Sequence, residues 1–261
     1  MANAKPKAPT KFQQRAARIV GRERFKRAHR AEKNYARQLV HIAKQVGIIV
    51  GGYAPRGVVS DISAITATLN RYADLINPWA KAVSQRMLAE VNQRDQESWN
   101  SLGKELGRGL RAEIRHAPTG ALFQSLLQDQ TDLITSLPKK AGQRVQELVI
   151  RAMSSGTRAD ETAKEIMKTG KVTRSRAMLI ARTTTTTASS SLVEARAQHI
   201  GSEGYLWRGS LDGDERKSHR KMEGKFIRWD SPPTLDGLTG HAGRLPNCRC
   251  WPEPVIPDII T

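Results

Sequence analysis

The stretch "KVTRSRAMLIARTTTTTASSSLVEARAQHIGSEGYLWRG", residues 171–209, contains the change of pattern that decides the fold. Small and apolar residues recur in it at helical spacing, at Ala177, Ala181, Thr184, Ala188, Leu192 and Ala195. This spacing predicts a long helix that begins at Thr173, runs to about Ile200 and ends at Gly201. After Gly204 the pattern alternates, and "YLWR" is typical of a strand. The sequence therefore predicts helices before this point and a small α+β module after it.

Residues 183–187 of the long helix are five consecutive threonines. Each β-branched threonine lowers helix propensity by a few tenths of a kcal/mol relative to alanine, so the run weakens an otherwise favourable helix. Small side chains allow another helix to approach closely, and core packing is the preferred interpretation of the run. We do not expect a catalytic role for its hydroxyl groups.

The part of the chain before residue 171 also has helical periodicity. Apolar residues recur at multiples of three and four residues at Phe12, Ala16, Ile19, Ala28, Ala31, Tyr35, Leu39 and Ile42. They predict one long amphipathic helix that ends at Gly47. Ser60 or Asp61 can cap a second helix that runs to Ile76, and Pro78 follows at the start of the next one.

A third long helix is predicted from Trp79 to about His116, with Val83, Met87, Val91 and Trp99 on its apolar face. Beyond Pro118, the segments "GALFQSLLQDQTDLITSL" and "KKAGQRVQELVIRAM" lie on the two sides of Pro138. Because proline disrupts helix interiors, we expect two short amphipathic helices that pair as a hairpin.

Positive charge is concentrated at the N-terminus. The first 44 residues contain 13 lysines and arginines against Glu23 and Glu32, which gives this arm +11 of the chain's total of +18. Such a concentration favours a polyanionic partner, and we expect non-specific contact with double-stranded DNA. The alternative is a solvated helix that contacts an acidic protein surface. The DNA-contacting candidates are Arg15, Arg18, Arg22, Arg24, Lys26, Arg27, Arg30, Lys33 and Arg37.

Hydropathy indicates a soluble chain. The longest apolar window, "VGIIVGGYA" at residues 46–54, is too short and too rich in glycine to span a bilayer. The N-terminus is charged where a signal peptide has an apolar segment. We therefore expect synthesis and use in the cytoplasm, without a membrane partner during assembly.

The segment "LPNCRCWPEP", residues 245–254, holds the two cysteines of the chain, Cys248 and Cys250. On an extended segment both thiolates point to the same side and can bind one Zn²⁺, with His219 and His241 or an aspartate completing a tetrahedron. A second interpretation is a metal-free polar cluster. Its members would be Asp212, Arg216, His219, Cys248 and Cys250. Oxidation or an intermolecular disulfide is the third alternative, so a structural zinc ion is an open question and no other cofactor is indicated.

Several linked elements carry a resemblance to a known family. They are "RSRAMLIARTTT", then "GYLWRGSLDGDERKSHRKMEGK", then "LPNCRCWPEP", in this order and at these intervals. The set resembles the phage Mu F-like head morphogenesis family of minor capsid proteins, over roughly residues 150–256. One departure is Thr184, because similar proteins commonly have an acidic residue after the Arg-Thr pair.

The resemblance implies a virion component of a tailed double-stranded DNA phage. Such proteins act with the portal and with the major capsid or scaffolding protein in head assembly. They lie in the capsid interior near the portal vertex, in multiple copies per virion, and some are thought to accompany or influence packaging or delivery of the genome. During assembly the protein would be in the host cytoplasm.

We therefore expect a mainly α protein, in which an elongated helical N-terminal and central region precedes a small α+β C-terminal module. The expected segments are a basic helical arm at 1–46, a helical body at 47–150, the helical part of the Mu F-like region at 151–204 and the α+β module with the CxC end at 205–261.

Two classes of function remain open. A structural and interaction protein needs no catalytic residues, whereas a metal-dependent nuclease or hydrolase would use His219 with Asp212 or Asp214. The sequence has no HExxH, P-loop or GxSxG motif and no cluster of carboxylates for a two-metal site. We therefore expect no enzymatic activity. A host nucleoid-like DNA-binding protein would leave the C-terminal module unexplained.

Overall fold

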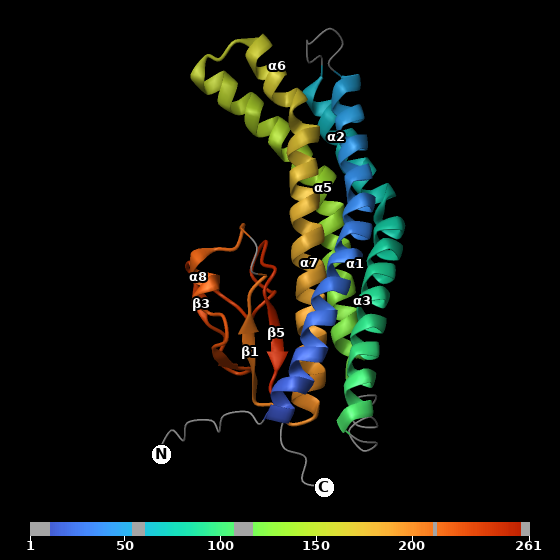
Figure 1. The fold of residues 1–261 in the computed structure, drawn as a ribbon. Coiled ribbons are helices and arrows are strands. Elements are labelled where there is room, and N and C mark those ends of the chain that lie inside the picture. The colour runs from blue at the N-terminus through green and yellow to red at the C-terminus, as the bar shows by residue number, and fades with distance from the viewer. Residues whose placement is uncertain (1–10, 54–60, 107–116, 211–212, 257–261) are drawn as a thin grey trace. The chain divides into compact units, whose positions relative to one another are not determined.

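The computed structural model of the chain describes residues 11–53, 61–106, 117–210 and 213–256, and describes no side chains within 11–28 and 102–106. The chain divides into two compact units. The first contains Met1–Ala31, Ala89–Phe123 and Thr185–Thr261, and the second contains Glu32–Leu88 and Gln124–Thr184. The fold is mainly α with a small C-terminal α+β module, which confirms the predicted class (Figure 1).

Long helices provide most of the structure. They are α1 (Lys11–Gly52), α2 (Ile62–Leu75), α3 (Asn77–Leu106), α5 (Gly120–Ser155), α6 (Ala159–Met167) and α7 (Thr169–His199). Asp61 caps α2, because its side chain accepts a hydrogen bond from the backbone N–H of Ala64 at 2.8 Å. Helix α3 begins beside Pro78, as predicted, and residues 107–116, to which the sequence extended it, lie outside the described part.

The second unit has an aliphatic core contributed by helix faces. Its fully buried side chains include Leu39, Ile42, Ile65, Leu69, Leu88, Ile134 and Leu137. Those from α1 belong to the predicted apolar face, so helical periodicity located this core. The threonine run is also partly internal, since Thr184 and Thr185 are buried. Packing therefore accounts for these two hydroxyl-bearing residues.

The predicted end of the first helix at Gly47 is wrong, because α1 continues to Gly52. Gly47 instead lies against Gly170 at the start of α7. A Cβ atom added to Gly170 would lie only 2.9 Å from the Cα atom of Gly47. Helix α7 also starts earlier than predicted, at Thr169, and the hydroxyl of Thr173 donates to the carbonyl of Thr169 at 2.8 Å. The two glycines therefore allow close contact between backbones.

The predicted hairpin around Pro138 is also wrong, because α5 is one helix with Pro138 inside it. Proline in a helix interior costs about 3 kcal/mol through its missing N–H and its ring. Pro138 is buried, and apolar residues that include Leu137 and Ala141 continue the buried face on both sides of it. Burial of this continuous face offsets the local cost, since packing supplies most helix stability in proteins.

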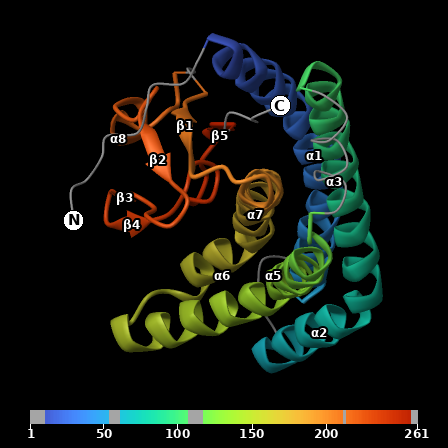
Figure 2. The same cartoon turned by 90° about the horizontal axis from the view of Figure 1, so that it is seen from below.

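The C-terminal module, residues 204–256 of the first unit, contains an antiparallel sheet in the order β2–β1–β5 (Figure 2). Its strands are β1 (Gly204–Arg208), β2 (Phe226–Arg228) and β5 (Trp251–Pro254), and the helix α8 (Lys217–Arg220) lies between β1 and β2 in sequence. The register pairs Tyr205 with Ile227 and with Pro254. A separate hairpin of β3 (Thr234–Leu235) and β4 (Leu238–Thr239) turns at Asp236 and Gly237, which both have positive φ.

The module packs on the C-terminal half of α7, within the same unit. The shared core contains Tyr205, Trp207 and Trp229 of the module together with Val193 and Ala197 of α7. Polar contacts fix the same surface: Ser190 donates to the carbonyl of Ala242 at 2.7 Å, and Arg244 pairs with Glu194. Figure 1 shows β5 on the side of the module that faces α7.

Among the residues described, none of the helices combines the length and the apolar composition needed to cross a bilayer.

Candidate metal-binding cluster in the C-terminal module

Three side chains that are distant in sequence meet in the module. His219 comes from α8, and Cys248 and Cys250 come from the segment that leads into β5. All three residues are buried. The backbone N–H of Cys248 donates to the carbonyl of Leu245 at 3.0 Å, and Asn247 has a positive φ of 58°, so a tight turn presents the pair.

The two cysteine side chains converge on the imidazole of His219. Its Nδ1 atom lies 3.5 Å from the Sγ atom of Cys248 and 3.5 Å from the Sγ atom of Cys250. One ligand atom from each residue lies within 4.8 Å of the others. The ring of Trp207 packs edge-on against the imidazole, with 5.7 Å between the ring centroids, and restricts its orientation. We call His219, Cys248 and Cys250 the His-Cys-Cys cluster.

The two thiols of the cluster differ in acidity. Several hydrogen bonds lower the pKa of Cys248 to about 4, and the one from Cys250 has the largest effect. His219 and the backbone N–H groups of Gly243 and Cys250 also lower this pKa, whereas burial opposes the shift. The same hydrogen bond, followed by burial, raises the pKa of Cys250. Neither cysteine forms a disulfide.

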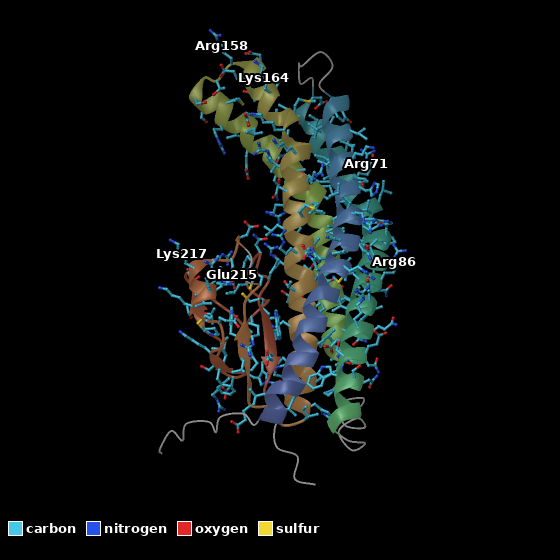
Figure 3. The ribbon with its side chains drawn as sticks, viewed as in Figure 1. Arg71, Arg86, Arg158, Lys164, Glu215 and Lys217 are labelled. Atoms are coloured by element: carbon cyan, nitrogen blue, oxygen red, sulfur yellow. The ribbon has the colours of Figure 1, made fainter. Side chains whose placement is uncertain are left out.

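Glu215 lies beside the His-Cys-Cys cluster, next to Cys250. The Sγ atom of Cys250 lies 3.5 Å from the Oε1 atom of Glu215. Its Oε2 atom is buried and has no hydrogen-bond partner among the residues that the structure describes. In Figure 3, Glu215 lies within the module whereas Lys217 points away from α8. Glu215 could not be identified from the sequence, because nothing in "DGDERK" distinguishes it from the neighbouring turn aspartates.

Gly209 makes room for the carboxylate of Glu215. A Cβ atom added to Gly209 would lie 2.3 Å from Oε1 and 2.9 Å from Oε2. Its backbone N–H donates to Glu223 at 2.6 Å, which holds the end of β1 in place. A Cβ atom at position 209 would therefore displace the carboxylate of Glu215 from its present place.

Arg216 joins the second layer around the cluster. Its Nη2 atom donates to the carbonyl of Pro246 at 2.8 Å, and its Nη1 atom lies 3.5 Å from Nε2 of His219. Four of the five residues of the predicted polar cluster are therefore together, and the fifth, Asp212, lies outside the described residues. Asp214 is exposed and pairs with Arg249 at 3.4 Å.

His241, the other predicted metal ligand, is not part of the cluster. Its Nδ1 atom lies 3.2 Å from the hydroxyl of Tyr205, and its ring packs against the rings of Tyr205 and Trp229. Burial lowers the pKa of His241. It is a core residue, and this arrangement leaves the fourth position of a metal site to another side chain.

The backbone of every predicted DNA-contacting residue belongs to helix α1. Arg30, Lys33 and Arg37 are exposed. For the others the side chains lie outside the described residues: Arg15, Arg18, Arg22, Arg24, Lys26 and Arg27.

The comparisons with known proteins concern the region that contains this cluster. Residues 143–252 match the model of the family described as phage Mu protein F like protein. An uncharacterized protein of Haemophilus influenzae is 32% identical over 165 residues, which is 63% of this chain. The match spans only 36% of that relative's length. No solved structure matches the chain. Residues 143–252, from the second half of α5 to the His-Cys-Cys cluster, therefore form a phage Mu F-like region, which confirms the resemblance seen in the sequence.

Proposed function

We propose that this chain is a head morphogenesis protein of a tailed double-stranded DNA phage, present in the virion in multiple copies. The observation that carries the proposal is the Mu F-like region at residues 143–252. In this proposal the protein acts with the portal and with the major capsid or scaffolding protein, in the capsid interior near the portal vertex. Before assembly it is in the host cytoplasm.

A second part of the proposal is non-specific contact with DNA through the basic face of α1. The helix is continuous from Lys11 to Gly52. Basic residues recur in it at intervals of three, four and seven, which places these positions on one face: Arg15, Arg18, Arg22, Lys26, Arg30, Lys33, Arg37 and Lys44. A row of cations along one face suits the phosphates of a duplex, since each neutralised phosphate releases counterions.

The described part of α1 supports the use of this face. Lys33, Arg37 and Lys44 are exposed, whereas Leu39 and Val46 on the opposite face are almost completely buried. The apolar face is therefore occupied by the core, and the basic face is available to a polyanion.

Replacing Lys33, Arg37 and Lys44 with glutamine tests the DNA contact. Binding to random-sequence duplexes is measured by fluorescence anisotropy at several salt concentrations. The slope of log affinity against log salt becomes shallower by about 0.9 for each phosphate that the variant no longer neutralises, and affinity falls equally for every sequence.

The matched control replaces Arg71, Lys81 and Arg86 with glutamine. These residues of α2 and α3 are also exposed, and Arg71 and Arg86 are labelled in Figure 3. The control has the same net charge as the test variant, so the proposal requires it to keep most of the salt slope. Equal decreases in both variants would mean that overall charge, and not the α1 face, attracts DNA.

The head assembly role is tested in particles. Phage made with a nonsense codon in this gene should yield few filled heads, and mass spectrometry of purified wild-type virions should detect the protein before and after DNA ejection. Normal yields of filled heads together with virions that lack the protein would contradict the proposal.

The alternative of a nuclease or hydrolase receives no support from the described geometry. His219 is 2% exposed and its Nδ1 atom faces two cysteines. A general base must reach the proton that it abstracts, directly or through a water molecule. A plasmid-nicking assay with and without divalent metal tests this alternative.

A further inference from the structure

The spacing of the His-Cys-Cys cluster matches the edges of a tetrahedral zinc site. Zinc binds sulfur at about 2.3 Å and imidazole nitrogen at about 2.0–2.1 Å, so a sulfur and a nitrogen on one tetrahedral ion lie about 3.5 Å apart. Both Nδ1–Sγ distances in the cluster are 3.5 Å. Both nitrogen–sulfur separations therefore already match those that one ion would impose, and the two sulfurs lie within 4.8 Å of each other.

Hydrogen bonding alone accounts for this arrangement less completely. The Nδ1 atom of a histidine either donates one hydrogen bond or accepts one through a single lone pair. It therefore serves only one of the two sulfurs that lie at the same distance from it. A cation at the centre of the three atoms binds Cys248, Cys250 and His219 together.

Glu215 is the candidate for the fourth position: its carboxylate lies beside Cys250 but outside the group of three ligand atoms within 4.8 Å of one another, so it would shift toward a bound ion. Its Oε1 atom is 3.5 Å from the sulfur of Cys250, which is also the separation of a sulfur and an oxygen bound to one tetrahedral zinc at about 2.3 Å and 2.0–2.2 Å. Its Oε2 atom is buried without a hydrogen-bond partner in the described residues. Burying a carboxylate oxygen without a partner is costly, and a bound cation removes this cost. The space that Gly209 leaves open is filled by this carboxylate.

We propose that Cys248, Cys250, His219 and Glu215 bind one structural Zn²⁺ ion that closes the C-terminal module. The inference does not rest on the proposed function, because it uses only the geometry of the module. Two thiolates favour zinc over magnesium or calcium, which prefer oxygen ligands. Two thiolates and a carboxylate around Zn²⁺ leave a net charge of −1, and Arg216 lies beside the site to balance it.

The proposal also fixes the tautomer of His219. Because Nδ1 binds the metal, Nε2 carries the proton and accepts no hydrogen bond from Arg216. The 3.5 Å distance between Nη1 and Nε2 is at the outer limit of a hydrogen bond, whereas Nη2 donates to the Pro246 carbonyl at 2.8 Å. Arg216 is therefore held mainly by the carbonyl.

The first experiment measures metal content and geometry in the full chain. Protein purified without chelator should contain about one zinc per chain by elemental analysis. After the zinc is removed, titration with Co²⁺ alone should produce the intense visible bands of a tetrahedral ion and a thiolate charge-transfer band. A chain that contains no zinc and gives neither spectrum with Co²⁺ would overturn the proposal and leave a metal-free cluster.

The second experiment isolates the fourth ligand. Glu215→Gln keeps the shape of the side chain and removes its charge, and should weaken Co²⁺ and Zn²⁺ binding more than about tenfold, the lower end of the effect seen for mutating even outer-shell partners. Asp214→Asn is the control, because it removes the adjacent carboxylate, which is exposed and paired with Arg249. Equal affinities in the two variants would show that Glu215 is not a ligand.

Gly209→Ala separates position from charge. The added Cβ atom must displace the carboxylate of Glu215, so this variant should bind Co²⁺ as weakly as Glu215→Gln while it retains the thiolate charge-transfer band. Unchanged affinity would contradict the assigned place of Glu215. The wild-type Co²⁺ titration tests the site even where a variant fails to fold.

Discussion

The helical second unit and the C-terminal module are stabilised in different ways. The helical unit buries aliphatic side chains such as Leu39, Leu69 and Ile134 along faces that repeat with helical spacing. The module buries three aromatic rings, two histidines and two cysteines in about fifty residues, with few aliphatic side chains. Burial of apolar area suffices for the first, whereas a small module needs specific cross-links between segments.

This contrast indicates where single substitutions act most strongly. In the helical unit a contact is one of many similar ones, and neighbouring side chains partly compensate when it is removed. In the module a few polar contacts connect α7, α8 and β5, so the loss of any one contact should lower stability more. We therefore compare matched substitutions in different parts of the molecule, in order of decreasing effect.

The largest contrast is expected between two ion pairs. In the first unit, Arg196 pairs with Asp95, and the two side chains are 5% and 1% exposed. In the second unit, Arg182 pairs with Glu32 at 3.3 Å, and these side chains are 28% and 8% exposed. Removing one partner of a fully buried pair leaves an uncompensated charge and costs about 3–5 kcal/mol.

Asp95→Ala should therefore lower the free energy of unfolding by about 3–5 kcal/mol, measured by urea denaturation, and Glu32→Ala by clearly less. The double replacement Arg196→Met with Asp95→Leu should recover most of this stability, because no charge remains unpaired. Equal decreases in Asp95→Ala and Glu32→Ala would show that the burial of an ion pair does not decide what its loss costs.

One glycine in each region tests how closely the backbone is packed there. Gly243 of the module has a φ of +82°, and an added Cβ atom would lie 2.9 Å from the carbonyl oxygen of Cys250. Gly170 faces Gly47 in the helical unit at the same distance. Both alanine variants should lose about 1–3 kcal/mol in thermal or urea unfolding, through strain at Gly243 and through the helix contact at Gly170.

Gly52 is the control for both, because an added Cβ atom would meet nothing within 4 Å. Gly52→Ala should be neutral or stabilise the chain by up to about 1 kcal/mol through helix propensity. A stabilising effect of Gly170→Ala would show that propensity, and not the contact with Gly47, governs this position.

The smallest effect is expected at neutral pH for Tyr35 of the helical unit. Burial raises the pKa of Tyr35 to about 12, with smaller opposing effects from the hydroxyls of Ser84 and Thr184. The folded state therefore favours the neutral phenol. Its contribution to stability is complete below pH 10 and decreases between about pH 10 and 12, at up to about 1.4 kcal/mol per pH unit.

Tyr35→Phe should remove this part of the alkaline sensitivity. The measurement compares urea unfolding of the wild type and the variant at pH 8 and pH 11. A wild type that loses no more stability than the variant at pH 11 would show that Tyr35 is not buried in the neutral form.

Sequence reasoning located the helical unit better than the cluster. Apolar periodicity identified Tyr35, Leu39 and Ile42 as core residues of α1, because one buried face produces a regular pattern. The proline rule predicted a break at Pro138, but burial of both flanking turns maintains the helix there. Gly47 was predicted to be a helix end, because the sequence alone does not show that Gly170 packs against it.

The cluster could be predicted only in part. The CxC spacing and a nearby histidine suggested a metal or polar centre, because these residue types have few other shared uses. The choice between His219 and His241 depends on which of the two the fold brings to the cysteines, and this is a property of the tertiary structure. Glu215 had no signal of its own, because its partner position, Gly209, is informative only once the two are seen together.

If the His-Cys-Cys cluster with Glu215 binds zinc, it closes the C-terminal module independently of the helical core. Segment-resolved hydrogen exchange on the full chain, before and after zinc removal by a chelator, measures this independence. We expect residues 204–256 to lose protection, while buried segments of α2 and α5 exchange as slowly as before. Unchanged protection of residues 204–256 after zinc removal, or an equal decrease across α2 and α5, would contradict this role of the cluster.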